Sequence, residues 1–138
     1  MLHWQGSARL ALNWLLPLWS GWGARSLSLD ERQQLQLIEV LEQALQADDP
    51  QADWLARAEQ ARLSQPHHMG LLYLYGRVCM RHSLWGKAQQ MLERCAPQLT
   101  QPGLQRKAWC ALAELAQQRG DEAAAAQACR RAALVAHP

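Results

Sequence analysis

Residues 107–125 read KAWCALAELAQQRGDEAAA, and this stretch decides the fold class. Alanine, leucine, glutamate and glutamine dominate it, and all are strong helix formers. Gly120 suits the left-handed backbone that ends a helix, and Asp121 suits the cap of the next helix. The stretch therefore predicts two helices joined by a tight turn.

The same composition extends over the whole chain of 138 residues. β-Branched residues are few and phenylalanine is absent, so the chain has little from which to build strands. We therefore predict an all-α protein. The expected helices span residues 6–16, 29–47, 50–63, 67–82, 84–97, 103–119 and 121–136.

Local signals set several of these boundaries. Ser28 and Glu31 have the spacing of a capping box, which predicts a helix start. Asp49 followed by Pro50 fits a cap and the first residue of another helix. Pro17 is expected to interrupt the N-terminal helix, because proline has no N–H group and its ring clashes with the preceding turn.

The C-terminal unit resembles the tetratricopeptide repeat, a pair of antiparallel helices with fixed key positions. Trp109 and Leu112 match the aromatic and leucine positions on the first helix of that family. Gly120 and Asp121 match its glycine-aspartate turn. The preceding unit has matching residues at the same positions of the repeat.

In that preceding unit Gly76 and Ala88 stand at the small-residue positions, and Trp85 stands at the aromatic position that opens the second helix. The unit before it is divergent, because Trp54 stands where a small residue is expected. The resemblance implies a single domain, a right-handed α-solenoid of about three helical hairpins plus an N-terminal helix. Its expected parts are a Trp-rich helix and turn at 1–27, a divergent repeat at 28–66, and repeats at 67–102 and 103–138.

The run Leu84-Trp85-Gly86-Lys87-Ala88 is similar to the C-terminal repeats of HemY-type proteins. These are bacterial inner-membrane proteins encoded with haem-biosynthesis genes, in which a membrane anchor precedes a soluble repeat domain. The resemblance implies that this chain is the soluble part, on the cytoplasmic side, and that it organises haem-biosynthesis enzymes without catalysis. It would meet the membrane only through a missing N-terminal anchor. A protoporphyrinogen oxidase activity is not expected, since the flavin-binding G-x-G-x-x-G motif does not occur.

The family's register also assigns a set of residues to a concave groove lined by the first helix of each hairpin. Arg77 and Arg81 lie one helical turn apart, and arginine binds carboxylates through two parallel hydrogen bonds. We therefore expect the groove to bind an acidic peptide or a protein C-terminus, with Tyr73 as an aromatic wall. The alternative is that both arginines are solvated surface charges. The residues assigned to the groove are Glu39, Gln43, Tyr73, Arg77, Arg81, Lys107, Glu114 and Gln118.

Charge excludes one class of partner. The formal net charge of +2 is too small to indicate a nucleic-acid-binding protein. It is unevenly distributed, since residues 27–63 carry a net negative charge and residues 64–100 a net positive one. No stretch reaches the roughly 20 apolar residues that a membrane-spanning helix needs.

The N-terminal region is rich in tryptophan. We expect Trp14 and Trp19 to pack against the helix at 29–47. Trp4 and Trp22 are expected to be exposed, on a surface that meets a membrane or a preceding repeat. An apolar end of this kind also predicts a weak homodimer through residues 1–30.

The cysteines and histidines carry the alternative function, direct binding of haem or a metal. Cys79 and His82 are three residues apart, which could place both on one helix face, whereas His67 and His68 have a weaker chelating geometry. Against this, all the cysteines are expected to be reduced and buried, so no cofactor is expected. Catalysis is the least expected function, because no glycine-rich phosphate loop, nucleophile elbow or H-E-x-x-H motif occurs. The cysteines are Cys79, Cys95, Cys110 and Cys129.

Overall fold

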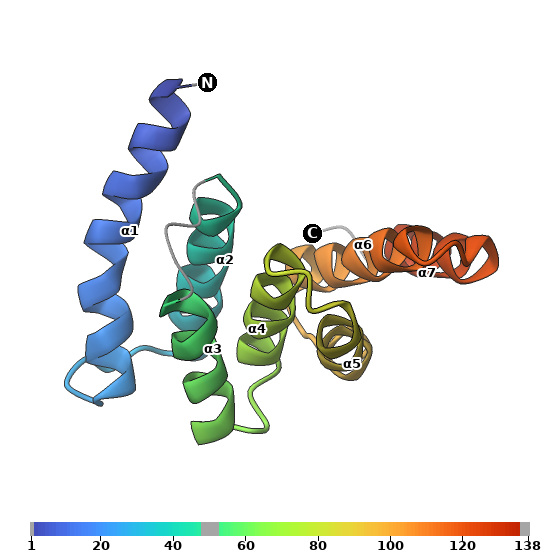
Figure 1. Cartoon of the computed structure of the whole chain (residues 1–138). Coiled ribbons are helices and arrows are strands. Elements are labelled where there is room, and N and C mark those ends of the chain that lie inside the picture. The colour runs from blue at the N-terminus through green and yellow to red at the C-terminus, as the bar shows by residue number, and fades with distance from the viewer. Residues whose placement is uncertain (1, 48–52, 136–138) are drawn as a thin grey trace.

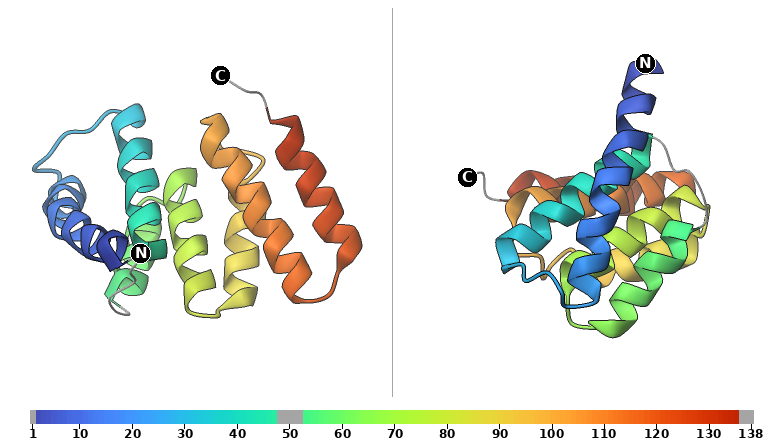
Figure 2. Two further views of the ribbon diagram at one scale, coloured as in Figure 1. Left: turned by 90° about the horizontal axis from the view of Figure 1, so that it is seen from above. Right: turned by 90° about the vertical axis from the view of Figure 1, so that its left-hand side faces the viewer.

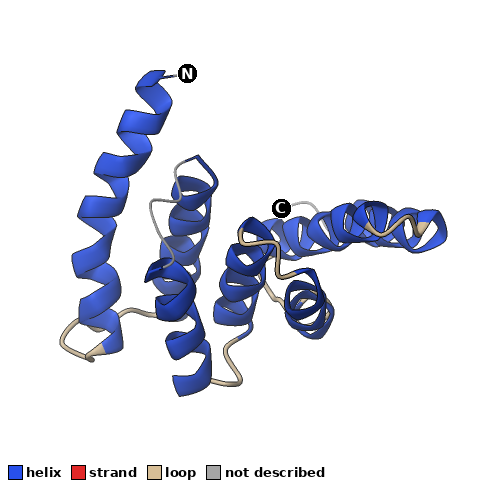
Figure 3. Ribbon diagram, viewed as in Figure 1, coloured by secondary structure: helices blue, strands red, loops and turns tan. Residues whose placement is uncertain are grey.

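The computed structural model describes residues 2–47 and 53–135, and within these ranges the regular structure is entirely helical (Figure 3). The prediction of an all-α protein is confirmed. The helices are α1 (Leu2–Gly23), α2 (Glu31–Ala47), α3 (Asp53–Ser64), α4 (Met69–Arg81), α5 (Trp85–Cys95), α6 (Pro102–Gln118) and α7 (Glu122–Leu134).

The helices follow one another across the molecule in chain order (Figure 1, Figure 2). The closest pairs are α4 with α5 and α6 with α7, each joined by a short turn. Helix α4 is central, because it also packs against α2 and α3 and touches α6. Helix α1 packs on α2, and its N-terminal end projects beyond the other helices (Figure 1, Figure 2).

The expected break at Pro17 does not occur, because α1 continues through this residue to Gly23. Pro17 lies on the exposed side of the helix, where its ring meets solvent rather than another helix. Leu12 and Trp19 on the opposite side are buried in the core. Packing on both sides of Pro17 therefore holds the helix straight through the position where one backbone hydrogen bond is lost.

The start of α2 differs from the prediction in its capping residues. The Gln33 backbone N–H donates to Asp30 Oδ1 at 2.8 Å, and the Asp30 backbone N–H donates to Gln33 Oε1 at 3.0 Å. This is a capping box built two residues later than Ser28 and Glu31, because α2 begins at Glu31 itself. The predicted cap at Asp49 and Pro50 lies outside the described residues.

The turn between α6 and α7 confirms the local prediction. Gly120 has a φ of 78°, and the Asp121 N–H donates to the carbonyl oxygen of Ala116 at 2.9 Å. The Asp121 carboxylate accepts a hydrogen bond of 3.0 Å from the N–H of Ala124, which caps α7. Hydrogen bonds within the turn thus pair backbone groups at the end of α6 and at the start of α7 that have no partner inside their own helix.

Small residues at the predicted positions let neighbouring helices approach closely. A Cβ atom on Gly76 would lie 2.9 Å from Leu92 Cγ, so α4 and α5 can pack this tightly only around a glycine. Ala88 and Leu112 are buried in the core, and Trp109 is partly buried. The guanidinium of Arg131 stands 5.5 Å above the centre of the Trp109 ring, which joins α7 to α6.

Only part of the prediction for the cysteines holds. Cys79 and Cys95 are buried, and burial raises the pKa of the Cys95 thiol to about 12. Cys110 and Cys129 are exposed, so the prediction was wrong for them. Their immediate neighbours Ala111 and Ala128 take the inward-facing positions, which turns each cysteine away from the core.

The tryptophans also depart from expectation. Trp19 is buried, with its ring centre 5.5 Å from that of Trp54 on α3, but Trp14 is 78% exposed, so its predicted packing was wrong. Trp22 is partly buried, with ring centres 5.8 Å from Trp19 and 5.6 Å from His68, so its predicted exposure was wrong. The side chain of Trp4 lies outside the described residues. Across residues 2–47 and 53–135, no helix has the length and apolarity that crossing a bilayer requires.

His68 caps the first turn of α4 and ties it to α2. Its Nδ1 accepts a hydrogen bond of 3.2 Å from the N–H of Leu71, so the ring proton resides on Nε2, which lies 2.9 Å from Gln34 Oε1. Burial lowers the pKa of His68, outweighing the effects of its own backbone and of Glu31, which raise it. The neutral imidazole is therefore the form that the fold requires.

We expect the free energy of unfolding to decrease as the pH falls, because His68 becomes protonated. A pKa that is lower in the folded than in the unfolded chain gives stability that is complete above about pH 6.5 and is lost as the pH falls below it. Urea unfolding at neutral and mildly acidic pH should show a smaller pH dependence for His68→Asn, which keeps a capping acceptor without titrating. His67→Asn at the exposed neighbour is the control. An unchanged pH dependence in His68→Asn would contradict the assignment.

Candidate functional site

A surface hollow of about 530 Å³ lies between the C-terminal ends of α2, α4 and α6 and the start of α5. We call it the α4–α6 hollow. Several of the residues assigned to the groove from sequence meet here, although they come from helices far apart in the chain. The residues that line the hollow are Gln46, Arg77, Met80, Arg81, Trp85, Glu114, Leu115 and Gln118.

The remaining groove residues lie outside this hollow. Glu39 of α2 forms an ion pair with Lys107 of α6, with 3.6 Å between Oε2 and Nζ. Glu39 also lines a second hollow of about 750 Å³, beside Thr100 and the N-terminal ends of α2 and α6. Gln43 is exposed on α2. The groove residues that line these hollows are thus distributed over both of them, with Glu39 in one and Arg77, Arg81, Glu114 and Gln118 in the other.

Arg77 is neither a free ligand-binding cation nor a solvated surface charge. Its Nε donates to Glu42 Oε1 at 3.0 Å, and its Nη1 lies 4.0 Å from Glu114 Oε2. Only 16% of its side chain is exposed. The alternative that Arg77 is a solvated surface charge is therefore wrong, since its charge joins α4 to α2 and α6 while it lines the hollow.

Tyr73 does not form a groove wall, because its side chain is buried beneath α2. Its hydroxyl donates to Glu42 Oε1 at 2.6 Å. Burial and then the neighbouring Glu42 carboxylate raise the pKa of Tyr73 far above its ordinary value. Tyr73 and Arg77 thus share one carboxylate oxygen, and together they compensate the burial of Glu42.

The sequence analysis missed Gln46, Met80 and Leu115, which line the hollow, and Glu42, which holds Arg77 from beneath. Among the described residues Glu42 is the buried polar side chain, 4% exposed between the apolar positions of α2. The signal was present, because Glu42 follows Leu41 inside the apolar stripe that Ile38 and Leu45 define. A carboxylate in such a stripe needs partners, and burial without them would cost several kcal/mol.

Arg81 is the more accessible cation of the α4–α6 hollow. It is exposed, and its Nη1 donates to the carbonyl oxygen of Gln46 at 2.8 Å, in the last turn of α2. No carboxylate among the described residues lies within ion-pair distance of it. Trp85 stands beside it at the start of α5, 39% exposed, and Met80 is partly buried. The hollow therefore combines a cation with an apolar wall.

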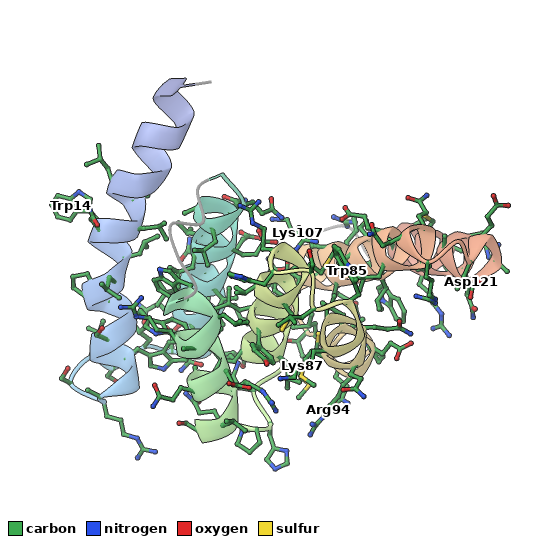
Figure 4. The ribbon with its side chains drawn as sticks, in the orientation of Figure 1. Trp14, Trp85, Lys87, Arg94, Lys107 and Asp121 are labelled. Carbon is green, nitrogen blue, oxygen red and sulfur yellow. The ribbon has the colours of Figure 1, made fainter. Side chains whose placement is uncertain are left out.

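Figure 4 separates this side of α5 from the other. In this view Trp85 lies above α5, toward Lys107. Lys87 and Arg94 lie below α5, on its opposite side. Lys87 forms a long ion pair of 3.9 Å with Glu59 of α3. Arg94 is exposed on α5 and lines none of the hollow, which makes it a suitable control for experiments on Arg81.

The structure places the residues of the haem alternative poorly for ligation. Cys79 is buried, and burial raises the pKa of its thiol, so the neutral form is favoured over the thiolate that binds metals. Both ring nitrogens of His68 are occupied by the contacts described above. Within residues 2–47 and 53–135, no group of three or more histidine, cysteine or carboxylate side chains has the arrangement of a metal site.

The α4–α6 hollow and its charges are thus formed by side chains from four helices of this chain. Arg77, Glu42 and Glu114 fix the walls, and Arg81 and Trp85 remain accessible on them. Comparison of the chain with protein-family models, with curated proteins and with solved structures found no match.

Proposed function

We propose that the chain is a non-catalytic protein-interaction scaffold that binds an acidic peptide segment or protein C-terminus in the α4–α6 hollow. The observation that carries the proposal is the pairing of the exposed Arg81 with the apolar wall of Trp85 and Met80. A carboxylate of the partner would pair with Arg81, and an adjacent apolar side chain would cover Trp85. Arginine is suited to this because its planar fork matches a carboxylate.

The charges in the hollow narrow the partner further. Arg77 already has Glu42 and Glu114 as partners, so it adds little attraction for a second carboxylate. Glu114 is 63% exposed and would repel a densely acidic segment. We therefore infer a ligand with one carboxylate beside an apolar residue, as at a protein C-terminus, rather than a polyacidic stretch.

The architecture supports a tetratricopeptide-type reading, in which the helices form a right-handed α-solenoid of stacked hairpins. Its supports are the chain-order succession of the helices, the close α4–α5 contact at Gly76 and the Gly120-Asp121 turn. The similarity of residues 84–88 to HemY-type repeats extends the proposal to a partner. In that case the partner is a haem-biosynthesis enzyme, and the chain is the cytoplasmic domain of a bacterial inner-membrane protein.

Arg81→Glu tests the binding mode. Peptides with a free C-terminal carboxylate beside an apolar residue, selected from a display library on the wild-type protein, are expected to bind Arg81→Glu at least about tenfold more weakly, because reversal turns a charge-assisted contact into repulsion. Fluorescence anisotropy with the selected peptides measures the affinities. Arg94→Glu has the same charge change on the other side of α5 and is expected to bind normally. Equal binding by both variants would remove the hollow as the site.

The partner is tested separately by affinity capture from bacterial membranes with the same three proteins as bait. A haem-biosynthesis enzyme retained by the wild type and by Arg94→Glu, but not by Arg81→Glu, is the expected result. Retention of that enzyme by all three baits would place its binding outside the hollow. Retention of other proteins alone would contradict the haem-biosynthesis part of the proposal.

A further inference from the structure

The outer face of α1 carries a stripe of exposed apolar side chains. Leu10, Trp14 and Leu18 are four residues apart, so they lie on one face of the helix, and they are 62%, 78% and 44% exposed. Figure 4 shows Trp14 directed away from the other helices. The opposite face is already used, since Leu12 and Trp19 are buried against the core. Helix α1 is thus apolar on two faces, and the core explains only one of them.

The charge around this stripe has a single sign. Residues 1–29 include Arg9 and Arg25 and no acidic residue, and the first carboxylate of the chain is Asp30. This contrasts with the net negative charge of residues 27–63. An apolar helix face with an exposed tryptophan, on a segment whose charges are all basic, matches the interface of an anionic lipid bilayer.

We propose that α1 binds the surface of an anionic lipid bilayer, lying in the interface with Leu10, Trp14 and Leu18 inserted among the acyl chains. The N-terminal end of α1 projects past the other helices, so the stripe can approach a flat surface (Figure 1, Figure 2). The indole of Trp14 suits this depth, since tryptophan prefers the boundary between headgroups and hydrocarbon. The site goes beyond the peptide-binding proposal, because no residue of α1 lines the α4–α6 hollow.

A second copy of the chain is a poorer occupant of this face. A stable protein–protein interface takes about 20–30 residues from each partner. The stripe offers Leu10, Trp14 and Leu18 on a single helix, with the exposed Asn13 and Pro17 beside them. A bilayer requires only a narrow face inserted about 5–10 Å into the headgroup boundary. The small size of the stripe and the absence of acidic residues from positions 1–29 therefore favour an anionic bilayer over a homodimer.

Vesicle sedimentation tests the proposal with the whole chain. The wild-type protein is expected to sediment with vesicles of phosphatidylcholine and phosphatidylglycerol, and much less with phosphatidylcholine alone. Leu10→Ser with Trp14→Ser should weaken binding to the anionic vesicles by at least about tenfold, because two inserted side chains are lost. Leu134→Ser removes a leucine of α7 that is 80% exposed, more than Leu10, and is expected to bind as the wild type does. Circular dichroism and urea unfolding confirm that the variants remain folded.

Three results would overturn the proposal. The first is a wild-type protein that does not sediment with the anionic vesicles. The second is binding that does not depend on the stripe or on lipid charge. In that case the double variant binds as well as the wild type does, or the wild type binds neutral and anionic vesicles equally. The third is a dimer in light scattering that the double variant converts to a monomer, without vesicle binding, which would assign the face to a second copy. The affinity of the selected C-terminal peptides is independent of all three, so it separates this proposal from the peptide-binding one.

Discussion

Replacing Glu42 with alanine is expected to lower the free energy of unfolding by about 3 kcal/mol, because it breaks a largely buried ion pair and leaves the partners unsatisfied. Arg77 Nε and the Tyr73 hydroxyl both donate to Glu42 Oε1, at 3.0 and 2.6 Å. The Tyr73 hydroxyl cannot reach water without movement of α4, since Tyr73 is fully buried, whereas Arg77 is 16% exposed and keeps part of its contact with solvent. Urea denaturation followed by circular dichroism measures the loss.

Glu39→Ala is the matched control for this prediction. Glu39 is on the same helix and also pairs with a cation, but its ion pair with Lys107 is 3.6 Å long, and the two side chains are 31% and 40% exposed. Its removal is expected to cost less than about 1 kcal/mol, as is usual for pairs in contact with solvent. Equal losses in the two variants would mean that the burial of Glu42 has no energetic consequence.

A second comparison separates the cost of breaking this network from the contribution of the network itself. The triple change Glu42→Leu, Tyr73→Phe, Arg77→Met removes every donor and acceptor together. It is expected to be more stable than Glu42→Ala alone, because no buried polar group is left unpaired. A triple variant less stable than the single one would show that the network itself contributes net stability beyond the cost of leaving it incomplete.

The network also shows why the groove could be predicted only in part. Repeat register placed Arg77, Arg81, Glu114 and Gln118 on facing helices, and the structure brings them to one hollow. Register could not show that Tyr73 points inward. Helix α4 is surrounded by α2, α3, α5 and α6, so residues 70–76 are all buried, and its charged side chains Arg77 and Arg81 begin only after this stretch.

The short-range signal of the α6–α7 turn was reliable, although the short-range signals at Ser28 and Pro17 were not. Gly120 and Asp121 act on backbone groups within a few residues, so their chemistry fixes the α6–α7 turn wherever the helices pack. The exposure of Cys110, Cys129 and Trp14 depends instead on which neighbouring helix covers each face. A single sequence carries little information about such contacts. The same limit explains Pro17, where packing on the far side outweighs the local preference of proline.

Replacing Gly76 with valine is expected to destabilise the protein by about 3 kcal/mol, because it overpacks the tightest contact between α4 and α5. A Cβ atom at this position would lie 2.9 Å from Leu92 Cγ and 3.4 Å from Met91 Cβ. Leu92 is itself fully buried, so its side chain has no free volume into which to move. Gly86→Val is the control, since a Cβ there meets nothing within 4 Å, and a change below about 1 kcal/mol is expected.

The double variant Gly76→Val with Leu92→Ala tests whether this loss comes from the clash itself. Leu92→Ala alone should cost about 2–5 kcal/mol, since it leaves a cavity in the core. In the double variant the valine methyl groups can occupy part of that cavity. The double variant should therefore lose less stability than the sum of the losses of the two single variants, by at least about 1 kcal/mol in a double-mutant cycle. Strict additivity would mean that Gly76 is needed for its backbone rather than for the approach of α5. Non-additive losses would show that glycine is needed at position 76 because α5 packs closely there. The interpretation of α4 and α5 as a tetratricopeptide-type hairpin requires this close packing.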